Sequence, residues 1–166
     1  MAKKYLKYFM TRDNQFITDE LKQFITNHSY SENLLTIACD SSWLLYEAIQ
    51  DAFYCNWPNT TGNRYWIKAK TCILNNGEMI NQTSSSEEAD KYFGYFIING
   101  DNKTDIIFDV DGNKSSIKTE TGLLLISPSS SETHSILWNF EEPLVMVKFY
   151  IEPTNLIDSN FMWTPF

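Results

Sequence analysis

The chain offers few residues that could carry metal, nucleophilic or acid–base chemistry. It has two histidines, His28 and His134, and three cysteines, Cys39, Cys55 and Cys72. Imidazole and thiolate are the ligands that most transition metals prefer. The cysteines share no Cys-x-x-Cys spacing, and the two histidines lie far apart in the chain, so no local metal motif is present. A lone histidine such as His134 is more often a structural or surface residue than a ligand.

Oxygen-bearing side chains could hold a harder cation. Asp105, Asp109 and Asp111 lie close together, and Asn81 and Gln82 carry amide oxygens. The distal glutamate of a calcium-binding loop is absent, and Asp-x-Asp-Gly is the sequence of an ordinary β-turn. We therefore expect these residues to form turns and polar loops. The six glycines form neither a Gly-x-Ser-x-Gly elbow nor a phosphate-binding loop.

The amino-acid composition and net charge exclude some classes of binding partner. The 166 residues are 43% hydrophobic and 15% aromatic, which is typical of one globular domain. The formal charge of −8 argues against nucleic-acid binding, which needs clustered Lys and Arg. The basic cluster at Lys3, Lys4 and Lys7 predicts a solvated terminal arm or an edge strand. No apolar run is long enough to span a membrane, and none has the form of a signal peptide.

Cysteine usage indicates the compartment. An odd number of cysteines in apolar or aromatic surroundings favours buried, reduced thiols over a disulfide framework. We therefore expect a cytoplasmic protein or a virion protein, without secretion by a signal peptide.

The elements that must position these residues fall into two groups. Thr18, as an N-cap before an apolar face, predicts a helix over residues 18–27, and helical spacing predicts a second over 42–54. The Pro- and Gly-containing segment 57–63 ends the second helix. Beyond it, short apolar runs separated by Asn, Gly, Asp and Ser predict strands. These are Tyr65–Leu74, Tyr92–Asn99, Thr104–Val110, Ser116–Lys118, Gly122–Ile126, Ser135–Trp138 and Leu144–Ile151. Seven short strands at this spacing predict a sandwich or barrel.

The order of these segments resembles a known family. The segments are Tyr65-Trp66-Ile67-Lys68, Gly77, Phe93-Gly94-Tyr95-Phe96-Ile97-Ile98, Ile106-Ile107-Phe108-Asp109, Gly122-Leu123-Leu124-Leu125-Ile126-Ser127-Pro128, His134 and Val145–Ile151. Together they resemble the short Fe(II)/2-oxoglutarate oxygenases over roughly the last hundred residues. The resemblance implies a mainly β fold with N-terminal helices, a double-stranded β-helix or jelly-roll. It implies one domain over 1–166, with helical support and an arm at 1–63, the jelly-roll core at 64–152 and an apolar tail at 153–166.

The resemblance also implies a set of metal and cosubstrate residues. The family uses a facial triad of two histidines and one carboxylate. His134 matches the distal histidine, but the first His-x-Asp or His-x-His pair, expected a few residues after Gly77, is missing from the segment 78–87. His28 could complete the set only by reaching the barrel mouth. Leu144 stands where the family has a basic residue for the cosubstrate, which leaves Lys148 as the nearby substitute. The metal and cosubstrate sites are thus expected to be lost.

Function is then expected to lie in surface contacts. Aromatic residues gather near both ends, at Tyr5, Tyr8 and Phe9 and at Phe161, Met162, Trp163 and Phe166. They predict either interaction surfaces for protein partners and self-assembly, or segments that pack on the chain's own barrel and cover an edge strand. The preferred hypothesis is a non-catalytic assembly subunit without a cofactor, such as a phage capsid, neck or tail protein. The alternatives are a divergent Fe(II)/2-oxoglutarate-dependent dioxygenase that uses His134, and a cupin-like binder of a small molecule or sugar.

Overall fold

The computed structural model describes residues 7–10, 14–27, 33–36, 39–57, 64–82, 91–110, 112–128, 132–153 and 164–166. The helical elements are α1 (Asn14–Asn27), the 3₁₀ turn η1 (Leu34–Thr36) and α2 (Asp40–Asn56). The strands are β1 (Lys7–Met10), β2 (Tyr65–Leu74), β3 (Met79–Gln82), β4 (Tyr92–Ile97), β5 (Asp105–Val110), β6 (Asn113–Lys118), β7 (Leu123–Pro128), β8 (Glu132–Leu137), β9 (Leu144–Pro153) and β10 (Thr164–Pro165).

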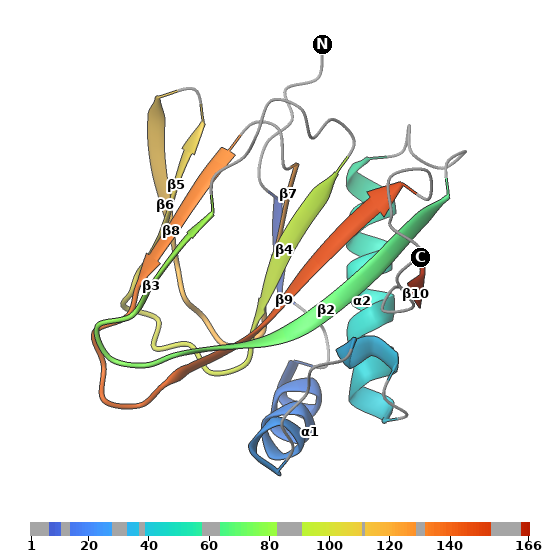
Figure 1. The fold of residues 1–166 in the computed structure, drawn as a ribbon, viewed down its shortest axis with the longest axis horizontal. Coiled ribbons are helices and arrows are strands. Elements are labelled where there is room, and N and C mark those ends of the chain that lie inside the picture. Colours follow the sequence, from blue (N-terminus) through green and yellow to red (C-terminus); the bar gives the residue numbers. More distant parts are fainter. Residues whose placement is uncertain are drawn as a thin grey trace.

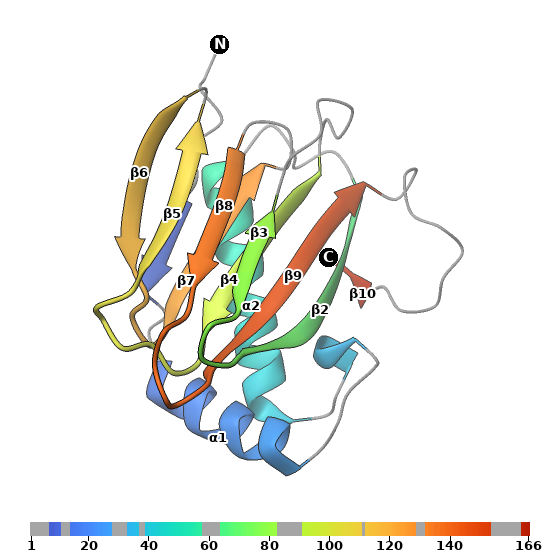
Figure 2. The same cartoon turned by 60° about the vertical axis from the view of Figure 1, so that its left-hand side comes forward.

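The strands form two facing sheets (Figures 1 and 2). The larger sheet has the order β1-β7-β4-β9-β2-β10 and the smaller one β3-β8-β5-β6. Every described strand pair is antiparallel. From β2 to β5, and again from β6 to β9, consecutive strands alternate between the two sheets, so the arrangement is a double-stranded β-helix. The predicted fold class is confirmed.

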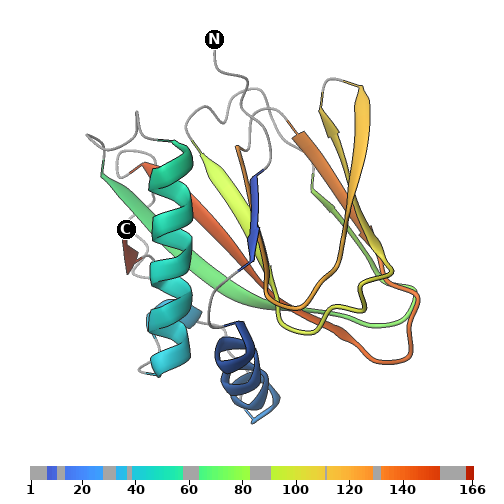
Figure 3. The same cartoon turned by 180° about the vertical axis from the view of Figure 1, so that it is seen from behind.

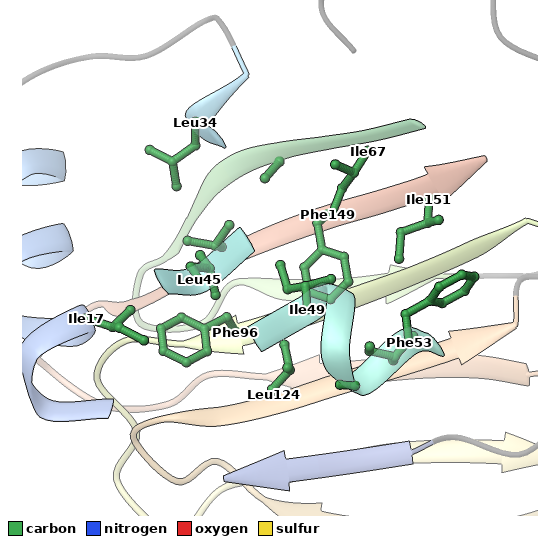
Figure 4. Packing of buried hydrophobic residues seen from close by; sticks show 14 of the residues in the cluster. Ile17, Leu34, Leu45, Ile49, Phe53, Ile67, Phe96, Leu124, Phe149 and Ile151 are labelled. Carbon is green, nitrogen blue, oxygen red and sulfur yellow. The ribbon is translucent and has the colours of Figure 1, made fainter. Parts of the chain in front are cut away.

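Two helices cover the outer face of the larger sheet (Figure 3). In α2, Leu45, Ile49 and Phe53 recur at helical spacing and lie against Phe96 and Phe149 of the sheet (Figure 4). All five side chains are fully buried. Burying one large apolar side chain contributes roughly 1.5–3 kcal/mol, so this apolar face holds α2 on the sheet.

A second apolar cluster fills the space between the sheets. Its most buried members include Ile97, Leu125, Ile136, Leu144 and Met146. The sheets meet at the end that carries the turns at 75–78 and 138–143, and they splay apart toward the opposite end (Figure 3). We call the splayed end the barrel mouth and the closed end the barrel floor.

Several sequence expectations need correction. Thr18 is not an N-cap, because α1 begins at Asn14 and Thr18 is buried inside the helix. β1 matches the edge-strand alternative for the segment that contains Lys7, since it lies at one edge of the larger sheet. The strands β3 and β10 were not expected, because their short sequences depend on distant partners for pairing. All three cysteines are free, but none is fully buried: Cys39 and Cys72 are partly buried and Cys55 is exposed. No helix in the described part of the chain is long and apolar enough to cross a membrane.

Candidate functional site

His134 lies near the barrel mouth, in strand β8. Its register partners are Gln82 in β3 and Phe108 in β5. Two residues further along β8, Ile136 is fully buried between the sheets. Residues two apart on a strand occupy the same face. The position of His134 therefore belongs to the inner face of the smaller sheet.

Gln82 occupies the position beside His134 where a second metal ligand would be expected. Thr83 and Ser84 follow it in the sequence and, like His28, lie outside the described residues. Within the described ranges, no group of three His, Cys, Asp or Glu side chains could bind a metal. The register thus brings one imidazole position and one amide position together, where a facial triad has two imidazoles and a carboxylate.

The described aspartates near β5 serve local structure. Asp109 accepts a hydrogen bond of 2.7 Å from the N–H of Gly112, whose φ of 84° lies in the left-handed region that glycine tolerates best. Asp105 forms an ion pair of 2.9 Å with Lys118. Asp111 lies outside the described residues. These contacts agree with the turn interpretation rather than with a calcium site.

Leu144, at the position expected for a basic residue, lies at the barrel floor. It begins β9, stands opposite Leu74 of β2 and is fully buried. Met146 and Ile97 belong to the same apolar cluster. A cation at this position would lose its hydration without gaining polar partners. The structure therefore explains why residue 144 is apolar: it is part of the core.

Basic and aromatic residues lie between the barrel floor and the barrel mouth. Lys148 in β9 stands opposite Lys70 in β2 and Tyr95 in β4, while Tyr150 stands opposite Lys68. The Lys148 Nζ atom lies 5.8 Å from the Tyr95 ring centroid and 5.1 Å from that of Tyr150. The Lys68 Nζ atom lies 5.6 Å from the Tyr150 centroid. We call these five residues the lysine–tyrosine cluster.

Sequence reasoning identified only Lys148 of this cluster. Lys68 and Lys70 alternate along β2 with residues that are buried under the helices, among them Ile67 and Ala69. Strand alternation therefore places both lysines on the inner face. This period-two pattern was the available signal, but the register between β2 and β9 was needed to bring the lysines opposite Lys148.

Burial controls the ionisation of two inner-face groups. It raises the pKa of the Tyr95 hydroxyl, and Tyr150 adds a smaller effect in the same direction. Burial also raises the pKa of the Cys72 thiol, while nearby Lys148 lowers it and Glu78 raises it. Tyr95 therefore keeps its proton at neutral pH. Lys148 favours negative charge on this face.

The described parts of both aromatic ends pack on the chain itself. Tyr8 and Phe9 lie in β1, which pairs with β7 and so covers one edge of the larger sheet. The ring of Phe166 lies 5.5 Å from that of Phe53, and the Tyr54 hydroxyl donates a 3.2 Å hydrogen bond to the Phe166 carbonyl. These contacts match the self-packing alternative.

The other aromatic residues proposed for interaction surfaces lie outside the described part. These are Tyr5, Phe161, Met162 and Trp163. A role in partner binding stays a prediction for them.

A cavity of about 410 Å³ lies at the barrel floor. Its lining includes Asp101, Trp138, Phe140, Glu141 and Glu142. Burial acts to raise the pKa of Asp101, but hydrogen bonds from the Lys103 N–H, the Thr119 hydroxyl, and the N–H and hydroxyl of Thr104 outweigh it and lower the pKa to about 2. The Asp101 carboxylate therefore accepts hydrogen bonds within its own turn and from Thr119, and it stabilises this loop.

Comparison with known proteins places the fold. No family model and no curated protein matches this sequence. Solved structures do match it. A prolyl-4-hydroxylase from Pseudomonas putida is 7% identical, with a TM-score of 0.69, and the alignment covers 91% of this chain and 89% of that one.

Two further structures share the fold. HygX from Streptomyces hygroscopicus, solved with nickel and 2-oxoglutarate bound, is 8% identical with a TM-score of 0.67, covering 91% of this chain and 83% of that one. The viral collagen prolyl hydroxylase vCPH from Paramecium bursaria Chlorella virus-1, solved in complex with 2-oxoglutarate, is 10% identical with a TM-score of 0.63. The alignment covers 89% of this chain and 96% of that one. At this identity the likeness shows the fold, which is that of the 2-oxoglutarate oxygenases.

These structures overturn two expectations. The preference for a non-catalytic assembly subunit is wrong, and so is the preference for no cofactor, because the solved proteins that share almost the whole fold are oxygenases with 2-oxoglutarate, nickel or iron in their structures. Both expectations were based on the absence of the family's metal and cosubstrate residues from the sequence. Those residues belong to one end of the barrel, whereas the structural likeness extends over about nine-tenths of the chain.

Proposed function

We propose that this chain is a divergent Fe(II)/2-oxoglutarate-dependent oxygenase with its site at the barrel mouth. The observation that carries the proposal is the strand register that sets His134 beside Gln82 on the inner face of a barrel with the oxygenase fold. In such a barrel, ligands of a metal ion come from neighbouring strands of the smaller sheet. The position of His134 is the one that the family uses for its distal histidine.

The residues present fit the cosubstrate better than they fit the metal. 2-Oxoglutarate is a dianion, and the lysine–tyrosine cluster supplies cations on the inner face. For the metal, His134 would supply an imidazole and Gln82 an amide oxygen, with water in the other positions. This set is weaker than two imidazoles and a carboxylate, so we propose that the metal site is partly degenerate.

The chain's own residues would define the environment of the reaction. When bound, Fe(II) and 2-oxoglutarate together supply the electrons that reduce dioxygen. The apolar barrel floor, with Leu144 and Met146, excludes water from below the site. The protonated Tyr95 hydroxyl and the Lys148 ammonium group can orient a carboxylate above the floor.

The decisive experiment is an anaerobic titration with Fe(II) and 2-oxoglutarate. We expect a metal-to-ligand absorption band and, after admission of oxygen, release of succinate. His134→Ala should abolish both, whereas His28→Ala, which changes the other histidine of the chain, is the matched control and should abolish neither. Absence of the band and of succinate in the unaltered protein would contradict the proposal.

A gain of function tests the proposed degeneracy of the metal site. Gln82→His combined with Ser84→Asp introduces the His-x-Asp spacing that the sequence lacks. We expect at least a tenfold increase in Fe(II) affinity, about 1.4 kcal/mol, because an imidazole and a carboxylate replace an amide and a hydroxyl. An unchanged affinity would mean that these positions do not face the metal.

Composition supports two further parts of the proposal. The chain is rich in Asn, Lys, Ile, Phe and Tyr, as an AT-rich coding sequence is, and we propose an origin in a tailed phage. Three free cysteines support action in a reducing compartment. Self-association or a protein partner remains a proposal that light scattering would test.

A further inference from the structure

Two adjoining cavities lie at the barrel floor, at the opposite end of the barrel from His134. The first is the cavity of about 410 Å³ described above. The second, of about 460 Å³, shares Asn99 and Glu142 with the first and extends toward α1. Its other lining residues are Lys22, Ile25, Ile73, Pro143 and Val145. We call the two cavities together the floor groove.

Hydrogen bonds hold the walls of the floor groove in place. The Asn99 side chain donates to the Pro143 carbonyl at 2.8 Å and accepts from the Val145 N–H at 2.5 Å. The Trp138 indole N–H donates to the Glu142 carbonyl at 2.7 Å. The loop between β8 and β9 is therefore bonded both to itself and to the turn after β4. The groove is preformed, so little ordering is needed when a ligand binds.

The first cavity has the chemistry of a cation site. The Phe140 ring is 37% exposed, and its centroid lies 5.1 Å from that of Trp138. An accessible aromatic face attracts an ammonium group. Glu141 and Glu142 are exposed, and neither side chain has an ion pair or hydrogen bond within the part of the chain that the structure describes. The described lining of this cavity includes no basic residue.

The chain itself contains a segment that complements both cavities. Its first ten residues include Lys3, Lys4 and Lys7 and no acidic residue, although the formal charge of the chain is −8. Tyr5 and Leu6 directly follow the first two lysines. Two ammonium groups followed by two apolar side chains match an acidic, aromatic cavity followed by a largely apolar one. Complementary charge favours this segment over an anionic or purely apolar one.

The position of β1 prevents this segment from reaching the floor groove of its own copy. Lys7 stands opposite Ile126, which stands opposite Gly94, and β1 runs from there toward the floor (Figure 2). Asn99 is five residues beyond Gly94 and two strands to the side, roughly 19 Å from Lys7. The residues before Lys7 start toward the mouth and would have to reverse. A tight turn would leave Lys4 within about 7 Å of Lys7.

We propose that the floor groove binds residues 3–6 of a second copy of this chain. The two lysines lie against the Phe140 ring and the two exposed glutamates, and the two apolar side chains that follow occupy the second cavity. Because single exposed ion pairs contribute little, the apolar contact is needed as well. Groove and donated segment lie at different places on each copy, so the contact is heterologous and each copy can bind one neighbour and be bound by another.

Charge reversal in the whole 166-residue chain tests the contact, with sedimentation velocity over a range of protein concentrations as the measurement. We expect the unaltered chain to self-associate at low salt and to dissociate at high salt, which screens exposed charges. Glu141→Lys combined with Glu142→Lys should raise the dissociation constant at least tenfold, and so should Lys3→Glu combined with Lys4→Glu. The chain with all four reversals, which keeps the net charge, should associate more strongly than either double variant.

Glu47→Lys combined with Asp51→Lys is the matched control. Both side chains are exposed on α2, so this variant makes the same change of charge away from the floor groove. It should not weaken self-association. Circular dichroism of each variant checks that it is folded, and recovery of binding in the chain with four reversals separates a lost contact from a damaged fold.

A synthetic peptide of residues 2–7 with blocked ends identifies the occupant. Its fluorescence anisotropy, after labelling, should rise with the unaltered chain and not with the variant that carries Lys at 141 and 142. If the chain stays monomeric while the peptide binds, the second copy is overturned as occupant, and a basic segment of another protein takes its place. If the chain associates but neither double reversal weakens it, or the four reversals restore nothing, the proposal is overturned.

Discussion

Asn33 completes the hydrogen bonding of one side of β2. Its amide nitrogen donates to the Ile67 carbonyl at 3.1 Å and to the Thr164 hydroxyl at 2.8 Å, and its oxygen accepts from the Ala69 N–H at 2.8 Å. The side chain is 2% exposed. Among the described residues, β10 pairs with β2 at positions 66 and 67, and the Phe166 N–H donates to the Tyr65 carbonyl, so Asn33 continues the hydrogen bonding of β2 beyond that pairing.

Asn33→Ala should destabilise the fold substantially. The change leaves the Ile67 carbonyl and the Ala69 N–H without this partner. Each buried polar group left unsatisfied costs about 1–3 kcal/mol. For the two groups the summed range is about 2–6 kcal/mol. We expect a loss in its lower half, about 3 kcal/mol, because a water molecule in the vacated space would offset part of the cost. For a chain of this size, that corresponds to a lower Tm by roughly 6–12 °C.

Urea unfolding followed by tryptophan fluorescence and circular dichroism measures this loss. The matched control is Asn75→Ala, since Asn75 is exposed and its side chain donates one hydrogen bond, 3.2 Å long, to Glu78. The control should stay within about 0.5 kcal/mol of the unaltered protein. An Asn33→Ala variant as stable as the control would refute the view that this amide closes the edge of β2.

Three further substitutions test the packing and the acid response. Gly94→Ala should lower the free energy of unfolding in urea by about 3 kcal/mol or more, because an added Cβ would lie 2.1 Å from the Leu125 carbonyl oxygen and 2.3 Å from the Phe149 ring. A variant as stable as the unaltered protein would contradict this. Phe166→Ala should lower the free energy of unfolding by about 2 kcal/mol, since the half-buried ring packs against α2. A change below about 0.5 kcal/mol would mean that this packing contributes little. The pKa of Asp101 in the folded protein, about 2, is below the ordinary value of 3.8 for this group, so its stabilisation is present above pH 4 and is lost as the pH falls toward 2. Asp101→Asn should be less stable at pH 7 and lose that part of the acid dependence, and an unchanged acid profile would contradict the assignment.

The well-predicted parts of the fold are those with strong local patterns. β2 has the predicted bounds, Tyr65–Leu74, because its side chains alternate between the helix-covered face and the barrel interior. α2 was predicted two residues shorter at each end than observed, and its apolar face was predicted correctly. β3, by contrast, reads Met-Ile-Asn-Gln and carries no strand signal of its own. It becomes a strand because β8 pairs with it.

The site was predicted in part for the same reason. Position after a recognisable strand and loop singled out His134, and the structure places residue 144, expected to be basic from the resemblance, in the apolar core as a leucine. The weight given to that departure was too large. The overall barrel is shared with oxygenases over 91% of the chain, even though sequence identity is only 7–8%. Conserved geometry at such low identity cannot be recognised from individual residues, since many apolar side chains fill the same space.

The sequence by itself determined the barrel, the scarcity of metal ligands and the apolar character of residue 144, because these depend on residue type and local periodicity. Only the tertiary structure decided which distant residues meet. It set Gln82 beside His134, placed Lys70 opposite Lys148 and folded Phe166 against α2. Strand register connects residues far apart in the chain, and it is determined by the packing of the whole sheet rather than by any one segment.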